Sequence, residues 1–374
     1  MIKPLTSLRF FFAFIVFLSH LEWVPKIDKS FSELYDNIFS KGYIGVSFFF
    51  MLSGFILALN YKEKILKKEI SFKEFWVSRI ARIYPLHLFT LCYSLIFFLP
   101  DLFKQPFFWL KSFTANLLLL QSFFPDEKVY FGFNAVSWSI SNELFFYLMF
   151  PVLLIILYKY PKSIHLMFLF FLLIPVGIYF TPKIHQIFLF SVNPMVRIAD
   201  FIFGILLYKL FELKFYSTWF EKRIAASFLE VTAILLFISF FALHDQVPFG
   251  YRFSIYYWIP TAGIIYAFAH AAGFFSRILS TRLLVFLGEI SFGFYMLHPF
   301  VMRSINAVER RMDYAPNLYL WVGGIFTATL ICSVFSYYYL ELPSNRRIRN
   351  WYRKNKILNP APVLFEEEKE VLSN

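Results

Sequence analysis

The chain alternates long runs of apolar residues with short polar stretches. Eleven apolar blocks are marked, at residues 5–24, 42–60, 83–99, 106–124, 136–158, 164–180, 187–208, 225–243, 253–272, 283–304 and 317–340. Each has about 17 residues or more, the length at which a helix crosses roughly 30 Å of hydrocarbon. The blocks lack the period-2 alternation of a membrane-spanning β-strand. The pattern therefore predicts an all-α, polytopic membrane protein.

The block at 106–124 differs from the others. It contains Lys111, Asn116 and Gln121, and it is flanked by Pro106 and Pro125. We interpret it as a non-spanning, partly buried segment on the outer side of the membrane. The remaining blocks predict about ten transmembrane helices.

Composition supports a membrane protein and excludes a soluble one. Hydrophobic residues make up 59% of the chain and charged residues 16%, whereas soluble domains carry roughly 25% charged residues. The net charge of +12 comes from basic stretches at 62–82, 209–223, 277–282 and 346–356. These stretches suit cytoplasmic loops beside anionic lipid, so no nucleic-acid partner is expected.

The same basic stretches predict the topology. All four face the cytoplasm only if an even number of spans separates each from the next, and ten spans satisfy this condition. Both termini are then cytoplasmic. We expect a membrane-embedded domain at 1–345 and a cytoplasmic tail at 346–374. The first block has no small-residue cleavage site after it, so we interpret it as a retained span.

Charged residues inside spans are costly and therefore mark candidate sites. Arg9 and His20 lie on the first span, eleven residues or roughly 16 Å of helix apart. A histidine titrates near neutral pH, which suits a general base acting on a hydroxyl group. The alternative is that His20 anchors the helix end at the membrane interface, close to Glu22 and Trp23.

A second candidate is the polar segment at residues 137–147. Ser139, Glu143 and Tyr147 follow one another at intervals of four, so they share one helix face. A carboxylate about two turns inside a span favours a function, and the alternative is a protonated Glu143 bonded to a neighbouring helix. We expect Glu143 and His20 in the same outer half of the membrane.

A third candidate is the arginine pair at the cytoplasmic start of the third span. Arg79 and Arg82 are three residues apart and can present two guanidinium groups to one anion, a geometry that suits phosphates. The alternative is ordinary anchoring of a cytoplasmic helix end by positive charge.

The remaining candidates are scattered. Arg197 and Asp200 lie three residues apart and are expected to pair with each other. Tyr295 and His298 lie on the apolar block at 283–304, where His298 is either a ligand or a structural histidine. No group of His, Cys, Asp and Glu in the sequence has metal-ligand spacing, so no metal site is predicted.

Six motifs in order over some 335 residues resemble acyltransferase family 3, the integral-membrane acyltransferases of bacterial surface polysaccharides. They are residues 5–9 with His20, the string at 42–55, the arginines at 79–82, the segment at 138–143, the segment at 288–299, and residues 341–343. Some members carry a C-terminal, extracytoplasmic hydrolase-like domain, and we expect this chain to be a member without it.

The resemblance implies an acyltransferase of the bacterial inner membrane. It implies a cytoplasmic acyl-CoA donor, with acetyl-CoA the commonest case, as a substrate and not a bound cofactor. Arg79 and Arg82 would lie near the donor phosphates and His20 would be required for transfer. The acceptor would be a hydroxyl of a cell-surface or lipid-linked glycan such as O-antigen, lipopolysaccharide or exopolysaccharide.

Our hypothesis for O-acetylation is that His20 deprotonates the acceptor and Glu143 orients its imidazolium. Direct transfer and a covalent acyl-enzyme both stay open. We expect supporting roles for the remaining site residues, which are Arg9, Ser139, Tyr147, Arg197, Tyr295 and His298.

Two alternative functions are compatible with parts of the sequence. A flippase-like transporter of a lipid-linked saccharide would also have many spans and buried charges. It would be expected to show internal repeats or paired broken helices, and no repeat is evident. A succinyl-type transferase acting on periplasmic glucans would share the same motifs.

Overall fold

The protein is built from helices. A computed structural model describes residues 2–213, 222–309 and 317–358, and no strand occurs in these ranges. The long helices are α1 (Lys3–Ser19), α4 (Ile44–Leu66), α5 (Phe72–Lys104), α8 (Trp138–Lys159), α9 (Ser163–Phe180), α11 (Pro194–Glu212), α13 (Arg223–Ala242), α16 (Arg282–Glu309) and α17 (Leu318–Ser336). The remaining α-helices are α2 (Val24–Ile27), α3 (Ser32–Asn37), α6 (Pro106–Leu117), α7 (Glu127–Tyr130), α10 (Lys183–Gln186), α14 (Trp258–Ala269), α15 (Phe274–Leu279) and α18 (Leu342–Leu358).

The helices confirm an all-α, multi-pass membrane protein. Among the described residues, eight helices are long and apolar enough to span a membrane, and a bent pair makes a ninth. The bent pair joins 183–192 to 194–212 at an angle of 46°. Its break falls at Asn193, which caps α11, and at Pro194, which lacks the N–H that would continue the preceding helix. The predicted span at 253–272 is a shorter apolar helix, Ile255–Ala269.

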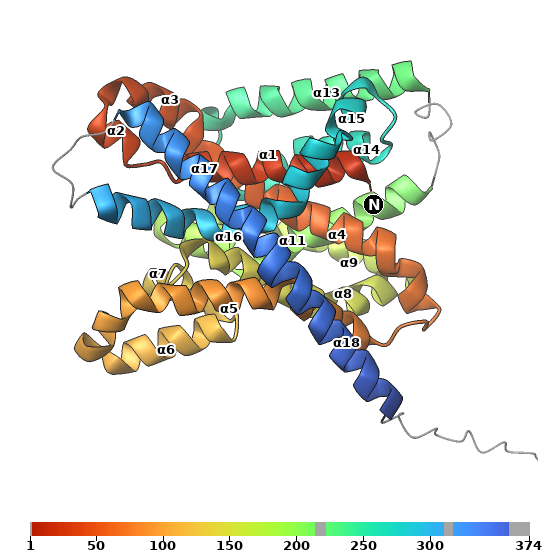
Figure 1. The fold of residues 1–374 in the computed structure, drawn as a ribbon. Helices are drawn as coiled ribbons and strands as arrows, with labels where there is room; N and C mark the ends of the chain where they lie inside the picture. The colour runs from red at the N-terminus through yellow and green to blue at the C-terminus, as the bar shows by residue number, and fades with distance from the viewer. Residues whose placement is uncertain (1, 214–221, 310–316, 359–374) are drawn as a thin grey trace, which may run out of the picture.

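The segment at 106–124 contains the twelve-residue helix α6 and a short 3₁₀ turn, Gln121–Phe123, and neither is long enough to count among the candidate spans. It folds back beside α5 at one side of the bundle (Figure 1). At the other end of the chain, α17 continues through a π-helical turn, Tyr337–Glu341, into α18. This helix crosses the predicted boundary at residue 345. The acidic end of the predicted tail, within 359–374, lies outside the described residues.

Glycines bring the central helices into backbone contact. A Cβ atom added to Gly204 in α11 would lie 1.9 Å from the Met51 carbonyl oxygen of α4. A Cβ atom on Gly54 would lie 2.1 Å from the Phe201 carbonyl oxygen of α11. Only a residue without a side chain permits this approach, which is how small residues join membrane helices.

The same type of contact surrounds α1. A Cβ atom on Gly288 in α16 would lie 1.9 Å from the Thr6 carbonyl oxygen, and one on Gly42 would lie 2.0 Å from the Ile15 carbonyl oxygen. α1 is therefore held directly against α16 on one side and against the 3₁₀ turn Phe39–Tyr43, just before α4, on another. Of the predicted site residues, Arg9 lies on α1, His20 follows its last turn, and Tyr295 and His298 lie on α16.

The glycine contacts lead to a prediction about stability. We expect Gly204→Ala to lower the free energy of unfolding by about 1–3 kcal/mol, because the added methyl group overpacks the α4–α11 contact. Gly323→Ala is the matched control, since nothing lies within 4 Å of the added Cβ atom. Thermal unfolding of the detergent-solubilised variants measures the difference. An equal midpoint for both variants would contradict the close contact.

Candidate functional site

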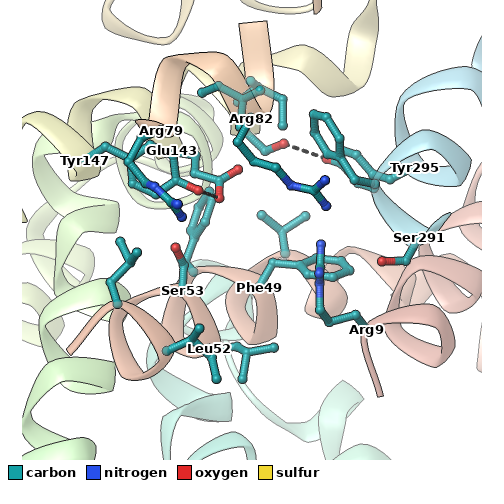
Figure 2. Close-up of a pocket in the computed structure, with 18 residues that line it drawn as sticks. Arg9, Phe49, Leu52, Ser53, Arg79, Arg82, Glu143, Tyr147, Ser291 and Tyr295 are labelled. Atoms are coloured by element: carbon teal, nitrogen blue, oxygen red, sulfur yellow. Dashed lines mark hydrogen bonds between the residues drawn. The ribbon is translucent and has the colours of Figure 1, made fainter. Parts of the chain in front are cut away.

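A cavity of about 180 Å³ lies inside the bundle, and charged side chains from three helices line it. Arg9 comes from α1, Arg79 and Arg82 from α5, and Glu143 from α8 (Figure 2). The other polar residues that line it are Ser53, Ser139, Tyr147, Ser291 and Tyr295. Three cations and one carboxylate therefore share a small space among apolar walls.

The two arginines of α5 face the cavity from consecutive turns of the helix. The Arg79 Nη2 atom donates a hydrogen bond to the Tyr61 hydroxyl at 2.9 Å, and its guanidinium carbon lies 5.1 Å from that ring centre. Arg82 Nη1 lies 3.6 Å from a carboxylate oxygen of Glu341, which is buried. Both guanidinium groups therefore face one space, as the three-residue interval predicted. That they bind a phosphate there stays a prediction.

Glu143 belongs to this arginine cluster. The Tyr147 hydroxyl donates a hydrogen bond to Glu143 Oε1 one turn along α8. Ser139, one turn earlier on the same face, also lines the cavity. The carboxylate sits among guanidinium groups, which offsets part of the cost of removing the charges from water.

Tyr295 of α16 forms one wall of the cavity. Its hydroxyl lies 2.8 Å from the Ser139 Oγ atom, a contact drawn as a dashed line in Figure 2. The same hydroxyl donates to the Val136 carbonyl oxygen at 3.2 Å. Its ring also contacts the His298 ring, with centres 6.1 Å apart. Tyr295 thus separates the arginine cavity from the histidines beyond it.

His20 and His298 form a pair at the end of α1. The His20 ring follows the last turn of α1, and its Nδ1 atom lies 2.8 Å from the Val16 carbonyl oxygen. His298 is fully buried, and its Nε2 atom lies 3.4 Å from His20 Nδ1. The two ring centres are 4.9 Å apart. Both residues were separate candidates in the sequence, which gave no indication that their side chains are in contact.

The predicted pairing of His20 with Glu143 is wrong. Glu143 shares its cavity with Arg9, which lies eleven residues or roughly 16 Å along α1 from His20. The sequence prediction placed both residues in the outer half of the membrane only because each lies near the outer end of its helix. Glu143, however, is five residues inside α8, a rise of roughly 8 Å, whereas His20 caps the end of α1.

A second cavity adjoins the first. The two share Arg9 and Arg82, and the second extends to Ile2, Asn60 and Glu289. Because α1 begins at Lys3, these residues mark the N-terminal end of the bundle, opposite His20. Arg9 and Arg82 therefore stand where a route from that end meets the inner cavity.

One residue of the site received no role from the sequence. Glu341 was noted only as part of the motif at 341–343, yet its carboxylate is the buried partner of Arg82. The signal was present as a carboxylate at the end of an apolar block, but nothing in the sequence names its partner. It lies in the π-helical turn between α17 and α18.

Arg197 and Asp200 form a buried ion pair, as expected. Arg197 Nε lies 2.9 Å from Asp200 Oδ2, and both side chains are almost completely buried. Arg197 also donates to the Ser47 hydroxyl at 2.9 Å, and Trp258 Nε1 donates to the other carboxylate oxygen. The pair lies outside the cavity lining and joins α11 to its neighbours.

A structural network lies at the loop after α13. Tyr43 and Tyr257 hydroxyls lie 3.1 and 2.9 Å from the two ring nitrogens of His244. Burial, with Arg252 and Lys41 nearby, lowers the pKa of His244 to about 4. This histidine is therefore neutral at physiological pH and serves as a hydrogen-bonding centre.

Comparison with known proteins gives a consistent result. A family model described as "Acyltransferase domain" matches residues 4–337. The acyltransferase MdmB from Streptomyces mycarofaciens is 30% identical over 324 residues, covering 81% of this chain and 79% of that protein. No solved structure matches the chain at a significant level.

Two other relatives are longer than this chain. A putative O-acetyltransferase from Staphylococcus aureus (strain COL) is 25% identical over 83% of this chain and 54% of its own length. The peptidoglycan O-acetyltransferase OatA from Listeria monocytogenes is 26% identical over 85% of this chain and 52% of its own length. The chain thus spans about half the length of these two relatives.

The Arg197–Asp200 pair leads to a prediction. Asp200→Asn leaves a buried guanidinium group without its counter-charge, so we expect a loss of about 3–5 kcal/mol in stability. Glu63→Gln is the control, because that carboxylate is exposed and pairs with Lys62 and Lys67 at the surface, so its loss should change little. Thermal unfolding in detergent compares the two. Equal stability of both variants would contradict the structural role.

Proposed function

The chain belongs to the acyltransferase domain family and is a membrane-embedded O-acyltransferase, and we propose that it moves an acetyl group from cytoplasmic acetyl-CoA to a hydroxyl of a cell-surface or lipid-linked glycan. The observation that carries the proposal is the arrangement of the site. Three arginines face a cavity open toward one end of the bundle, and a partly exposed histidine lies toward the other.

The arginine cavity suits the donor. Coenzyme A carries several phosphate groups, and guanidinium forks bind phosphate oxygens through paired, charge-assisted hydrogen bonds. Arg9 and Arg82 stand where the two cavities meet, so phosphates held there would direct the thin pantetheine arm inward. The roughly 16 Å between Arg9 and His20 is a distance that an extended arm bridges.

His20 is the proposed general base. Its Nε2 atom takes the proton of the acceptor hydroxyl while that oxygen attacks the thioester carbonyl carbon. The tetrahedral intermediate then collapses, the carbon–sulfur bond breaks, and the departing thiolate takes the proton from His20. The products are the acyl ester and free coenzyme A, and His20 returns to its neutral form.

The orientation in the membrane is also part of the proposal. Basic residues follow α4 and α15 and fill α18, and such residues favour the cytoplasmic side. The N-terminal end of the bundle then faces the cytoplasm in a bacterial inner membrane, and the arginine cavity opens to the side on which acyl-CoA is made. His20 faces the opposite side, where surface glycans are assembled.

The acceptor class is supported by one relative. OatA is named as a peptidoglycan O-acetyltransferase, which favours a glycan hydroxyl for this chain as well. The cavity of about 180 Å³ has room for a small acyl group with part of its carrier. A succinyl group would add a second carboxylate beside Glu143 or the arginines, so competition between acetyl-CoA and succinyl-CoA distinguishes the two donors.

The first prediction concerns transfer itself. Membranes that contain the protein and are given radiolabelled acetyl-CoA should label the surface glycan of the host, and His20→Ala should reduce this labelling by a factor of roughly 100 or more, because the general base is lost. Labelled glycan is separated from lipid and protein and then counted. Equal labelling by both proteins at equal expression would remove His20 from the reaction.

The second prediction concerns the donor site. We expect Arg79→Ala and Arg82→Ala each to raise the KM for acetyl-CoA roughly tenfold or more, because hydrogen bonds to charged groups contribute about 1.5–3 kcal/mol. Arg277→Ala is the matched control, an exposed arginine on α15. An unchanged KM in both cavity variants would show that the phosphates bind elsewhere.

A further inference from the structure

The side chain that contacts the His20 ring is another histidine, His298 of α16. His298 is completely buried, and the aromatic rings of Phe17, Phe294 and Tyr295 lie around it. A leucine would fill such an apolar site without the cost of burying two ring nitrogens. The polar partner outside its own helix is His20. This arrangement points to a role in the reaction.

We propose that His298 is the positioning residue of His20, which holds its ring in place and stabilises it when it becomes protonated. This inference rests on the proposed function, in which His20 is the general base. It assigns to a neutral histidine the orienting role that the sequence had suggested for Glu143.

The hydrogen bonds define the proton positions in the neutral pair. His20 Nδ1 lies 2.8 Å from the Val16 carbonyl oxygen, which only accepts, so Nδ1 carries the proton. His298 Nδ1 lies 3.2 Å from the Phe294 carbonyl oxygen and carries its proton for the same reason. The lone pair of His298 Nε2 then faces the His20 Nδ1–H at 3.4 Å.

These positions leave His20 ready to act as a base. Its Nε2 atom has an available lone pair and no hydrogen-bond partner among the described residues. His20 is also only partly buried, whereas His298 is fully enclosed. Of the two rings, His20 is therefore the one that an acceptor hydroxyl reaches.

Protonation of His20 strengthens the contact with His298. When Nε2 takes the acceptor proton, the ring becomes a cation and its Nδ1–H becomes a stronger donor. The Val16 carbonyl oxygen and His298 Nε2 face this hydrogen in both states, and both contacts are stronger when the ring is a cation. The bonding therefore improves most in the protonated state that forms during the reaction.

The test compares two substitutions that differ in one property. His298→Gln keeps an acceptor oxygen near the position of Nε2, whereas His298→Leu fills the site without an acceptor. We expect His298→Leu to lower kcat for acetyl transfer to glycan by roughly 30- to 100-fold, within the range of general-base effects. His298→Gln should stay within roughly tenfold of the parent. The KM for acetyl-CoA should stay within roughly twofold in both, because the arginine cavity is intact.

His87 provides the matched control. It is also buried and lies in α5, away from His20. Its Nε2 atom lies 2.8 Å from the Asn116 carbonyl oxygen. His87→Leu should leave kcat within roughly twofold of the parent. An unchanged kcat in His298→Leu, or an equal loss in the leucine and glutamine variants, would overturn the positioning role.

A second readout does not depend on activity. In protein labelled with ¹⁵N-histidine, the His20 ring signals, identified by their loss in His20→Ala, should be sharp in the parent and in His298→Gln. They should broaden in His298→Leu as the ring samples other rotamers, and unchanged sharp signals would overturn the proposal. If the parent transfers no label from acetyl-CoA, the proposed function fails while these signals still decide the contact between the histidines.

Discussion

The central constraint on this protein is the burial of like charges in an apolar bundle. Three guanidinium groups, from Arg9, Arg79 and Arg82, face one cavity inside the membrane-spanning helices. Such an arrangement is costly unless opposite charges and hydrogen bonds compensate for lost water. Glu143 supplies one negative charge from within the cavity and Glu341 another from behind Arg82. The positive charge that remains supports the proposed binding of the donor phosphates in this cavity.

The distance between this cavity and the histidine pair is set by α1, because Arg9 and His20 lie on the same helix. Glycine contacts hold α1 against α16 and α4 at backbone distance, so the walls on either side have little freedom to move. Tyr295 then occupies the level between the two centres, with its hydroxyl on Ser139 and its ring on His298. In the proposed reaction, Tyr295 therefore lies between the donor cavity and the proposed base.

Much of this arrangement was predictable from the sequence, because hydropathy reports membrane spans directly. The apolar blocks predicted the helical class, and intervals of three or four residues predicted the shared faces of Arg79 with Arg82 and of Ser139 with Glu143. Contacts between distant helices were not predictable, because periodicity within one helix carries no information about its neighbour. The predicted pairing of Glu143 with His20 was wrong for this reason. The contact of His20 with His298, 278 residues further along the chain, was not predicted for the same reason.

The choice of a histidine beside His20 follows from the same electrostatic constraint. A carboxylate next to a buried base stabilises the imidazolium strongly, but before the reaction it is an uncompensated charge. In the arginine cavity, guanidinium groups offset that cost for Glu143. At the level of His20 no arginine lines the contact in the described structure, so a carboxylate there would be expensive in the resting state. The neutral lone pair of His298 costs less at rest and still accepts the Nδ1–H of His20 once the cation forms.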